Sequence, residues 1–198
     1  MAILKIARAG HPVLLQVAEE VVDPTAPDIR ALVRDMVETL EDAGGIGLAA
    51  PQVHMSARVV IFFVPERRTG DDENDSAEEL TVMINPIIEP GAPDTELDWE
   101  ACLSLPGMMG AVPRFTQIKY SWTNLNGDAE ERTASGFHAR AVQHECDHLD
   151  GILYPMRMTD MSLYGFAEEV NRNRDLMMSA RPETEDKADA DAEDEAEE

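Results

Sequence analysis

The sequence predicts a single-domain α+β protein, and three observations lead to that fold class. Three segments have the residue spacing of helices, and three others have the apolar or alternating pattern of β-strands. These segments do not alternate regularly along the chain, which disfavours a doubly wound parallel sheet. The length of 198 residues is enough to fill one core. We expect residues 1–181 to form this domain.

The chain begins with an arm and continues into a helix. Residues 5–15 contain a Gly-His-Pro sequence, which favours an ordered arm with a turn over a long helix. Pro27 suits a first helical turn, and the glycines at 44 and 45 supply a stop. Between them, apolar residues recur at helical spacing, at Ile29, Leu32, Val33, Met36, Val37 and Leu40. We predict an amphipathic helix here.

Residues 45–52 (GIGLAAPQ) consist almost entirely of small residues. The ordinary interpretation is a helix C-cap followed by a loop. An alternative is a backbone free of bulky side chains, against which a ligand can lie. Gln52 has the only side chain in this segment that can donate a hydrogen bond. The residues alone leave both interpretations open.

Three segments are predicted to be strands: 58–64 (RVVIFFV), 80–88 (LTVMINPII) and 117–124 (QIKYSWTN). Residues 70–79, between the first two, contain six acids. We interpret that stretch as a solvated loop between strands. An Asn-Gly-Asp turn follows the third strand.

Residues 137–150 are predicted to be a helix that ends at Gly151. His144 and His148 are four residues apart, so their imidazoles lie one turn apart on the same face. Both can therefore bind one metal ion, with the Glu145 carboxylate close by to move protons. A catalytic divalent site usually adds a third protein ligand and keeps one position open for water.

The third ligand is not determined by this helix. The long zinc-protease motif would place a histidine at position 154, where the chain has Tyr154. A thermolysin-like endopeptidase would use a downstream glutamate, and Glu168 and Glu169 lie at a suitable distance in the sequence. The upstream candidate is Cys102. Each candidate third ligand implies a different class of enzyme, and sequence spacing alone does not distinguish the candidates.

The remaining segments and the net charge limit the expected partners and the expected cellular location. A last helix is predicted over 162–178, with Leu163, Phe166, Val170 and Met177 as its apolar stripe. Residues 183–198 hold ten acids and one lysine, so we expect residues 182–198 to be a disordered acidic tail. The net charge of −24 argues against direct nucleic-acid binding. No apolar run approaches the ~20 residues of a membrane span, and no signal peptide is evident, so we expect a cytoplasmic protein.

Three motifs occur together in this sequence: GIGLAAPQ (45–52), EACLS (100–104) and QHECDHLDG (143–151). In this order and with the flanking CLSLPG, VPR and GFHARAVQHE, they resemble the signature motifs of the peptide deformylases. The resemblance extends from the N-terminal arm to about Met158. It implies small mixed or antiparallel sheets around a central metal-binding helix, with an N-terminal and a C-terminal helix.

The resemblance also implies a reaction. A metal-dependent hydrolase would remove the N-formyl group from the N-terminal methionine of newly synthesised polypeptides and release formate. The implied ligands of the metal are Cys102, His144 and His148. The implied cofactor is one divalent ion, Fe(II) first, with Zn(II) or another divalent metal as a substitute.

The resemblance assigns three catalytic residues. Glu145 would take a proton from the attacking water and deliver it to the departing amine. The Gln52 amide and the Leu103 backbone N–H would stabilise the developing oxyanion. The implied substrate-binding residues are Gly45 and Gly47, along whose backbone a peptide can lie, and Ile46, Leu103, Ala141 and Val142, which would line a methionine pocket.

Two positions depart from the family pattern. The family usually has glycine where this chain has Ala101, and if that position needs a positive φ, alanine costs roughly 1 kcal/mol. Met109 stands where relatives often carry arginine. These departures leave a paralogue with weak or no activity as one alternative to an active deformylase. The HExxH motif at 144–148 leaves a zinc endopeptidase as a second. The expected partners are N-formylmethionyl nascent peptides, in proximity to the ribosome.

Overall fold

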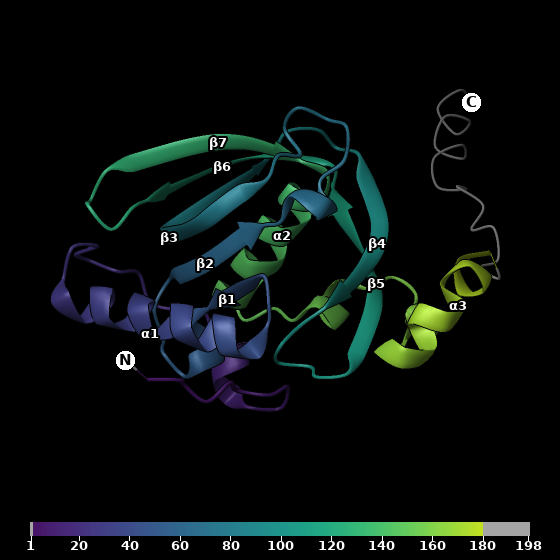
Figure 1. Cartoon of the computed structure of the whole chain (residues 1–198), viewed down its shortest axis with the longest axis horizontal. Coiled ribbons are helices and arrows are strands. Elements are labelled where there is room, and N and C mark those ends of the chain that lie inside the picture. The colour runs from purple at the N-terminus through teal and green to yellow at the C-terminus, as the bar shows by residue number, and fades with distance from the viewer. Residues whose placement is uncertain (1, 180–198) are drawn as a thin grey trace, which may run out of the picture.

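The computed structural model describes residues 2–179, which form two antiparallel sheets and three α-helices joined by turns and short 3-10 helices (Figure 1). The larger sheet has the strand order β1-β2-β3-β6-β7, and the smaller has the order β4-β5-β8. The acidic tail expected at 182–198 lies outside the described residues.

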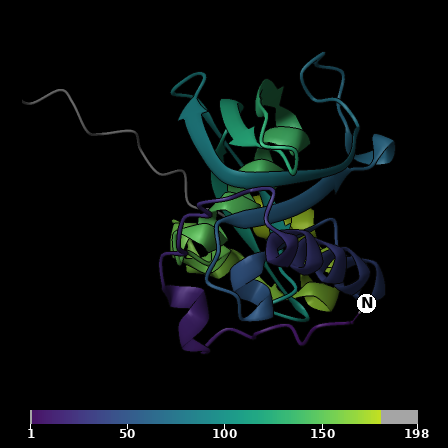
Figure 2. The ribbon, with the colours of Figure 1, turned by 90° about the vertical axis from the view of Figure 1, so that its left-hand side faces the viewer.

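The five-stranded sheet is the middle layer of the molecule. Its strands are β1 (Gly47–Ala49), β2 (Val59–Val64), β3 (Glu78–Pro90), β6 (Gln117–Thr123) and β7 (Ala129–Ser135). Neighbouring strands all run antiparallel. Figure 2, a quarter turn away from Figure 1, shows how strongly these strands curve.

Two helices cover opposite faces of this sheet because the side chains of β2 alternate between them. Val59 and Ile61 pack with α1 (Pro27–Ala43), in a cluster that includes Met36 and Leu40. The intervening β2 residues Val60, Phe62 and Val64 pack instead with α2 (Gly136–Leu149), in a cluster that includes Ala139, Val142, Cys146 and Leu149. The strand β2 therefore buries both of its faces, and α2 lies on the inner side of the sheet.

The three-stranded sheet joins the other side of α2 to the last helix. Its strands are β4 (Thr95–Ala101), β5 (Met108–Phe115) and β8 (Tyr164–Phe166). The helix α3 (Ala167–Ser179) lies beside β4 and β5 in Figure 1. It packs on the sheet through Val170, which shares an apolar cluster with Trp99, Met109 and Ala111. The Gly107 carbonyl also accepts a hydrogen bond from the Ala167 amide (2.8 Å).

Several predicted elements are confirmed. The α+β class, the N-terminal arm, α1, α2 and the strands β2, β3 and β6 all occur close to their expected positions. Gly44 caps α1 in the left-handed region (φ 69°). Cys146 is buried in the apolar cluster on α2, as a packed thiol should be.

Other predictions are wrong. The last helix begins at Ala167 and not at residue 162, because residues 161–166 form a 3-10 turn and the strand β8. Phe166, expected on the apolar stripe, is 68% exposed. Residues 47–49, expected in a loop, form the edge strand β1. The strands β4, β5, β7 and β8 were not predicted at all.

The acid-rich segment 70–79 is more than a solvated loop. Asp75 is 6% exposed, and its carboxylate accepts hydrogen bonds from the backbone N–H of Gly70 (2.7 Å) and of His138 (3.0 Å). His138 lies in the first turn of α2, whose own N-cap, Ser135, makes no side-chain capping bond. Asp75 thus caps α2 from 63 residues earlier in the sequence.

The helices within residues 2–179 include none that is both long and apolar enough to cross a membrane.

Candidate metal centre

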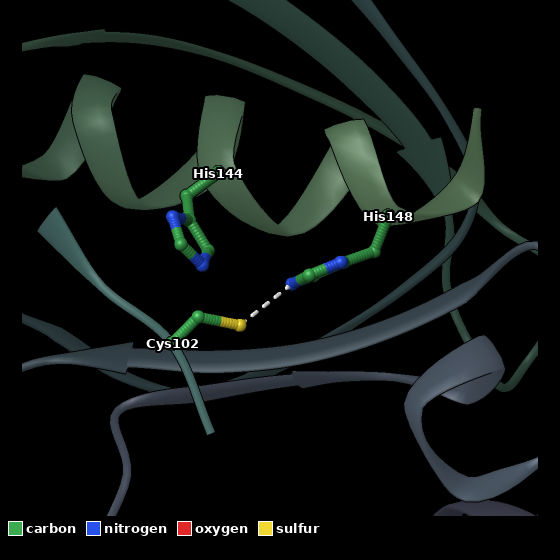
Figure 3. A group of neighbouring side chains, drawn as sticks. All are labelled: Cys102, His144 and His148. Atoms are coloured by element: carbon green, nitrogen blue, oxygen red, sulfur yellow. Dashed lines mark hydrogen bonds between the residues drawn. The ribbon is translucent and has the colours of Figure 1, made fainter. Parts of the chain in front are cut away.

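Three potential ligand atoms converge between the two sheets (Figure 3). Cys102 directly follows β4, and His144 and His148 lie on α2, one turn apart. Their ligand atoms all lie within 4.8 Å of one another. The Cys102 Sγ is 3.3 Å from Nε2 of His148. One thiolate and two imidazoles in this arrangement fit a tetrahedral Zn(II) or Fe(II) site with one open position.

A buried carboxylate orients the first histidine. Nδ1 of His144 is 2.7 Å from Glu100 Oε2, and an ionised carboxylate only accepts, so Nδ1 donates. Nε2 of His144 is therefore left free to bind a metal. Glu100 lies on β4, two residues before Cys102, and its side chain is 4% exposed. The strand β4 thus positions Cys102 and, through Glu100, also orients His144.

Two arginines neutralise this carboxylate. Arg114 on β5 donates two hydrogen bonds to Glu100 (2.8 and 2.9 Å). Arg140 on α2 donates a third (3.0 Å), and Arg114 also reaches Asp147 (2.5 Å). This charged cluster (Glu100, Arg114, Arg140 and Asp147) joins β4, β5 and α2 around the ligands. Arg140 and Asp147 had given no signal in the sequence beyond their place on the helix.

These surroundings shift the pKa values of the site. Burial alone would raise the pKa of Glu100, but the hydrogen bonds from Arg114 and His144 hold it well below its usual range. Burial likewise opposes ionisation of Cys102, yet the neighbouring His148 and His144 lower the pKa of its thiol well below the ordinary value. A thiolate is the form that binds metal.

Glu145 lies within the site but outside the ligand set. Its side chain is buried, and burial raises its pKa to about 7. Its Oε2 accepts no hydrogen bond from the described part of the chain. A carboxylate with a pKa near neutrality can both accept and return a proton at physiological pH.

The glycines of the first motif make room for side chains. A Cβ on Gly47 would overlap the carboxylate of Glu145, and one on Gly45 would meet Leu103 and Leu40. The lack of side chains at 45 and 47 therefore has a packing cause that neither interpretation of this segment included. Glycine at 47 is required first by the close approach of Glu145.

Gln52 is held beside the sulfur ligand. It is 1% exposed, and its Oε1 accepts a hydrogen bond from the Ala49 amide (2.9 Å). Its Nε2 donates to Ser104 Oγ (3.1 Å) and to Cys102 Sγ (3.4 Å). The acceptor oxygen faces away, so the amide N–H groups are the ones that face the metal site.

A cavity of about 460 Å³ opens next to these residues. Five of the six expected substrate-binding residues line it: Gly45, Ile46, Gly47, Leu103 and Ala141. Val142 does not, because it is fully buried in the apolar cluster between α2 and the larger sheet. Ala141 and Val142 are adjacent on a helix, so they point in different directions. The lining residues that were not expected include Arg68, Trp99, Met109, Phe137, Arg140 and Arg174.

The endopeptidase hypothesis is wrong on the ligand geometry. Glu168 and Glu169 are exposed on α3, where both pair with Arg172 (2.5 and 3.3 Å). The cysteine, and neither glutamate, joins the histidine pair. Ala101 carries no backbone strain of the kind considered above, because apart from glycines only His54 and Asn85 have a positive φ within residues 2–179.

Comparisons with known proteins agree with this geometry. The family model described as polypeptide deformylase matches residues 3–164. The chain is 45% identical to peptide deformylase 1 of Nitrosomonas europaea over 163 residues, which cover 82% of this chain and 92% of that protein. It is 48% identical to peptide deformylase 2 of Ralstonia nicotianae over 168 residues, covering 82% of this chain and 91% of that protein.

Solved structures give the same result. A crystal structure of a class I type b peptide deformylase from Acinetobacter baumannii matches with a TM-score of 0.72 at 33% identity, covering 80% of this chain and 100% of that one. The peptide deformylase of Ehrlichia chaffeensis matches with a TM-score of 0.75 at 28% identity, covering 91% and 98%. The chain belongs to the polypeptide deformylase family, and it is a metal-dependent hydrolase that removes the N-formyl group from polypeptides.

Proposed function

We propose that Cys102, His144 and His148 hold one divalent metal and that Glu145, Gln52 and Leu103 carry out deformylation around it. The observation that carries this proposal is the convergence of the three ligand atoms within 4.8 Å, beside a buried carboxylate that is not a ligand. Fe(II) is the proposed native ion, and Zn(II) or another divalent metal can substitute, since thiolate and imidazole ligands suit both. When bound, the ion lowers the pKa of a water molecule and polarises a carbonyl oxygen.

Glu145 moves the proton. Its carboxylate accepts a proton from the attacking water as the water oxygen bonds to the formyl carbon. The same carboxyl group then donates a proton to the amide nitrogen as the C–N bond breaks. Formate and a free N-terminal amine leave. The pKa of about 7 that burial gives this carboxyl suits both halves of the cycle.

Gln52 and Leu103 stabilise the charge on the former carbonyl oxygen. The Gln52 amide donates through Nε2, which now hydrogen-bonds to Ser104 and Cys102 beside the site. The Leu103 backbone N–H is the second donor, next to Cys102 in the chain. Donors fixed in a buried site lower the energy of the charged intermediate without having to reorganise.

The cavity is the proposed binding site of the formylmethionyl chain. Residues 45–47 offer backbone along one wall, and Leu103 with Ala141 contacts the methionine side chain. Backbone contacts bind many sequences alike, which suits an enzyme that acts on many nascent chains. Because its substrates are made at the ribosome, we place its action in the cytoplasm, in proximity to the ribosome.

Formate release from formyl-Met-Ala-Ser by anaerobically prepared Fe(II) protein tests this proposal. Glu145→Gln should retain the metal and lose about 10²–10⁴-fold in kcat, since the amide is similar in shape but cannot accept the proton. Unchanged turnover in this variant would exclude Glu145 as the base.

A second pair of variants tests the ligand set. Cys102→Ser should lose the metal, because the serine hydroxyl is a much poorer ligand than thiolate. Glu168→Gln, on the exposed face of α3, should retain it. Metal analysis of both purified variants gives the answer, and loss of metal in the glutamine variant alone would contradict the proposed ligands.

A further inference from the structure

The helix α3 forms one wall of the cavity. This wall contains an arginine, Arg174, that has no role in the proposed catalytic steps. Arg174 lines the cavity together with Trp99 and Met109. Its guanidinium carbon is 5.9 Å from the centre of the Trp99 ring, and its Nη2 is 3.8 Å from Met109 Sδ. Its Nε and Nη2 also donate to Asn171 Oδ1 (3.1 and 2.8 Å). Arg174 is therefore held in place by a ring, a thioether and a neutral amide.

The charge of Arg174 is not neutralised by a neighbour. No carboxylate among residues 2–179 forms an ion pair with it within 4.0 Å. Arg172, two residues earlier on the same helix, pairs with both Glu168 and Glu169. In a chain of net charge −24, an arginine that faces a cavity without an acidic partner is available to a ligand.

Arg174 lies beside the strand that ends at the sulfur ligand. Met109, which it contacts, is paired in register with Ala101, the residue before Cys102. The pairing of β5 with β8 fixes the start of α3 against this wall. Asp98, one of the acids that line the cavity, lies near Arg140 (4.0 Å). It is adjacent to Trp99 on β4, so the two side chains leave the strand on opposite faces.

We infer that Arg174 is a substrate-binding residue that selects formyl peptides with a carboxylate downstream of the methionine. This rests on the proposed function, since the peptide must enter the cavity with its formyl group at the metal site. The guanidinium donates a two-pronged hydrogen bond to the carboxylate, while Trp99 supports its apolar face. The carboxylate is either an acidic side chain or the terminus of a short peptide.

Three substrates separate these sources: formyl-Met-Ala-Asp-amide, formyl-Met-Ala-Ser as the free acid, and neutral formyl-Met-Ala-Asn-amide. The unsubstituted enzyme should hydrolyse at least one carboxylate peptide with a kcat/KM about fivefold above that of the neutral one, through a lower KM. A preference for the aspartyl peptide identifies a side-chain carboxylate as the ligand. A preference for the free acid identifies a terminal carboxylate. The preference should shrink as salt is raised.

Arg174→Gln should remove the preference, so that its kcat/KM for the carboxylate peptide falls to that for the neutral one. Arg172→Gln, the matched control on the same helix, should keep the preference. Arg174→Lys should keep part of it, because the charge remains but the planar fork is lost. Calorimetric binding of the product Met-Ala-Asp-amide should weaken in Arg174→Gln and not in Arg172→Gln.

An equal preference in the unsubstituted and Arg174→Gln enzymes overturns the inference, and so does an equal loss in both glutamine variants. If the neutral peptide is hydrolysed in either case, the proposed function stands. Absence of formate from all three peptides contradicts the proposed function, and the inference with it.

Discussion

The two sheets pack against the metal-binding helix with opposite chemistry. The five-stranded sheet contacts α2 mainly through apolar side chains, with Val60, Phe62 and Met83 against Val142 and Leu149, and with a neutral hydrogen bond between Tyr120 and His138 (2.9 Å). The three-stranded sheet contacts the same helix through charge, with Glu100 and Arg114 bonded to His144, Arg140 and Asp147.

The two kinds of contact have different roles. The apolar contacts stabilise α2, and the charged hydrogen bonds orient its ligand side chains. Burial of apolar surface is non-directional and stabilises α2 without specifying where an imidazole nitrogen points. Charged hydrogen bonds add little net stability once desolvation is counted, but they fix orientation. We therefore expect damage on the five-stranded side to lower the free energy of unfolding, and damage on the three-stranded side to lower metal affinity.

The largest expected effect is on the apolar side. Phe62→Ala removes a fully buried ring from the contact with α2 and should cost about 3–5 kcal/mol of unfolding free energy. Chemical denaturation measures this loss. Metal affinity, measured where the variant is still folded, should stay close to the original value.

Phe62→Leu is the matched control for this change. It keeps most of the buried volume and should cost clearly less than the alanine variant. A large drop in metal affinity in the leucine variant would mean that packing on the five-stranded side also sets the ligand geometry.

An intermediate effect is expected on the charged side. Glu100→Gln can keep the oxygen that accepts from His144 Nδ1, but an amide nitrogen in place of Oε1 cannot accept from Arg114 Nε or Arg140 Nη1. Metal affinity should fall about 10–100-fold. Competition with a metal chelator under conditions where the protein is folded measures it, and unchanged affinity would show that Glu100 does not orient the ligand.

The smallest effect is expected at the point where β4 passes into the ligand loop. Ala101→Gly should lower the unfolding free energy by roughly 0.5–1 kcal/mol, because Ala101 lies in a strand and its φ is not positive. The kcat/KM for a formyl peptide should change by less than about tenfold. A gain of several orders of magnitude would instead mean that the alanine methyl disables the site.

The sequence predicted the parts of the molecule whose pattern is local. The helices α1 and α2 have clear periodicity or a dense motif, and β2 is a continuous apolar run because both of its faces are buried. The strand β7 (AEERTAS) was missed because it is mostly polar and lies at the edge of its sheet. The strand β5 contains Gly110 and Pro113, which ordinarily argue against a strand.

The site was predicted as a set of residues but not as a set of contacts. The motifs identified the cysteine, the two histidines and the glutamate, because each motif contains the residue itself. They could not show that Gly47 is needed to accommodate Glu145, a residue far along the chain. Nor could they show that Arg174 faces the cavity, since it lies beyond the matched segment 3–164.

The capping of α2 by Asp75 limits how the acid-rich segment between β2 and β3 can change in length. Asn74 accepts a backbone hydrogen bond from Ser135, and the side chain of Ser135 donates to Asp72, so residues 72–75 are attached to the start of the helix. Insertions between residues 75 and 78 would leave this attachment intact. A deletion that removes Asp75 would expose the first turn of the helix that carries both histidines, although none of the ligands had been altered.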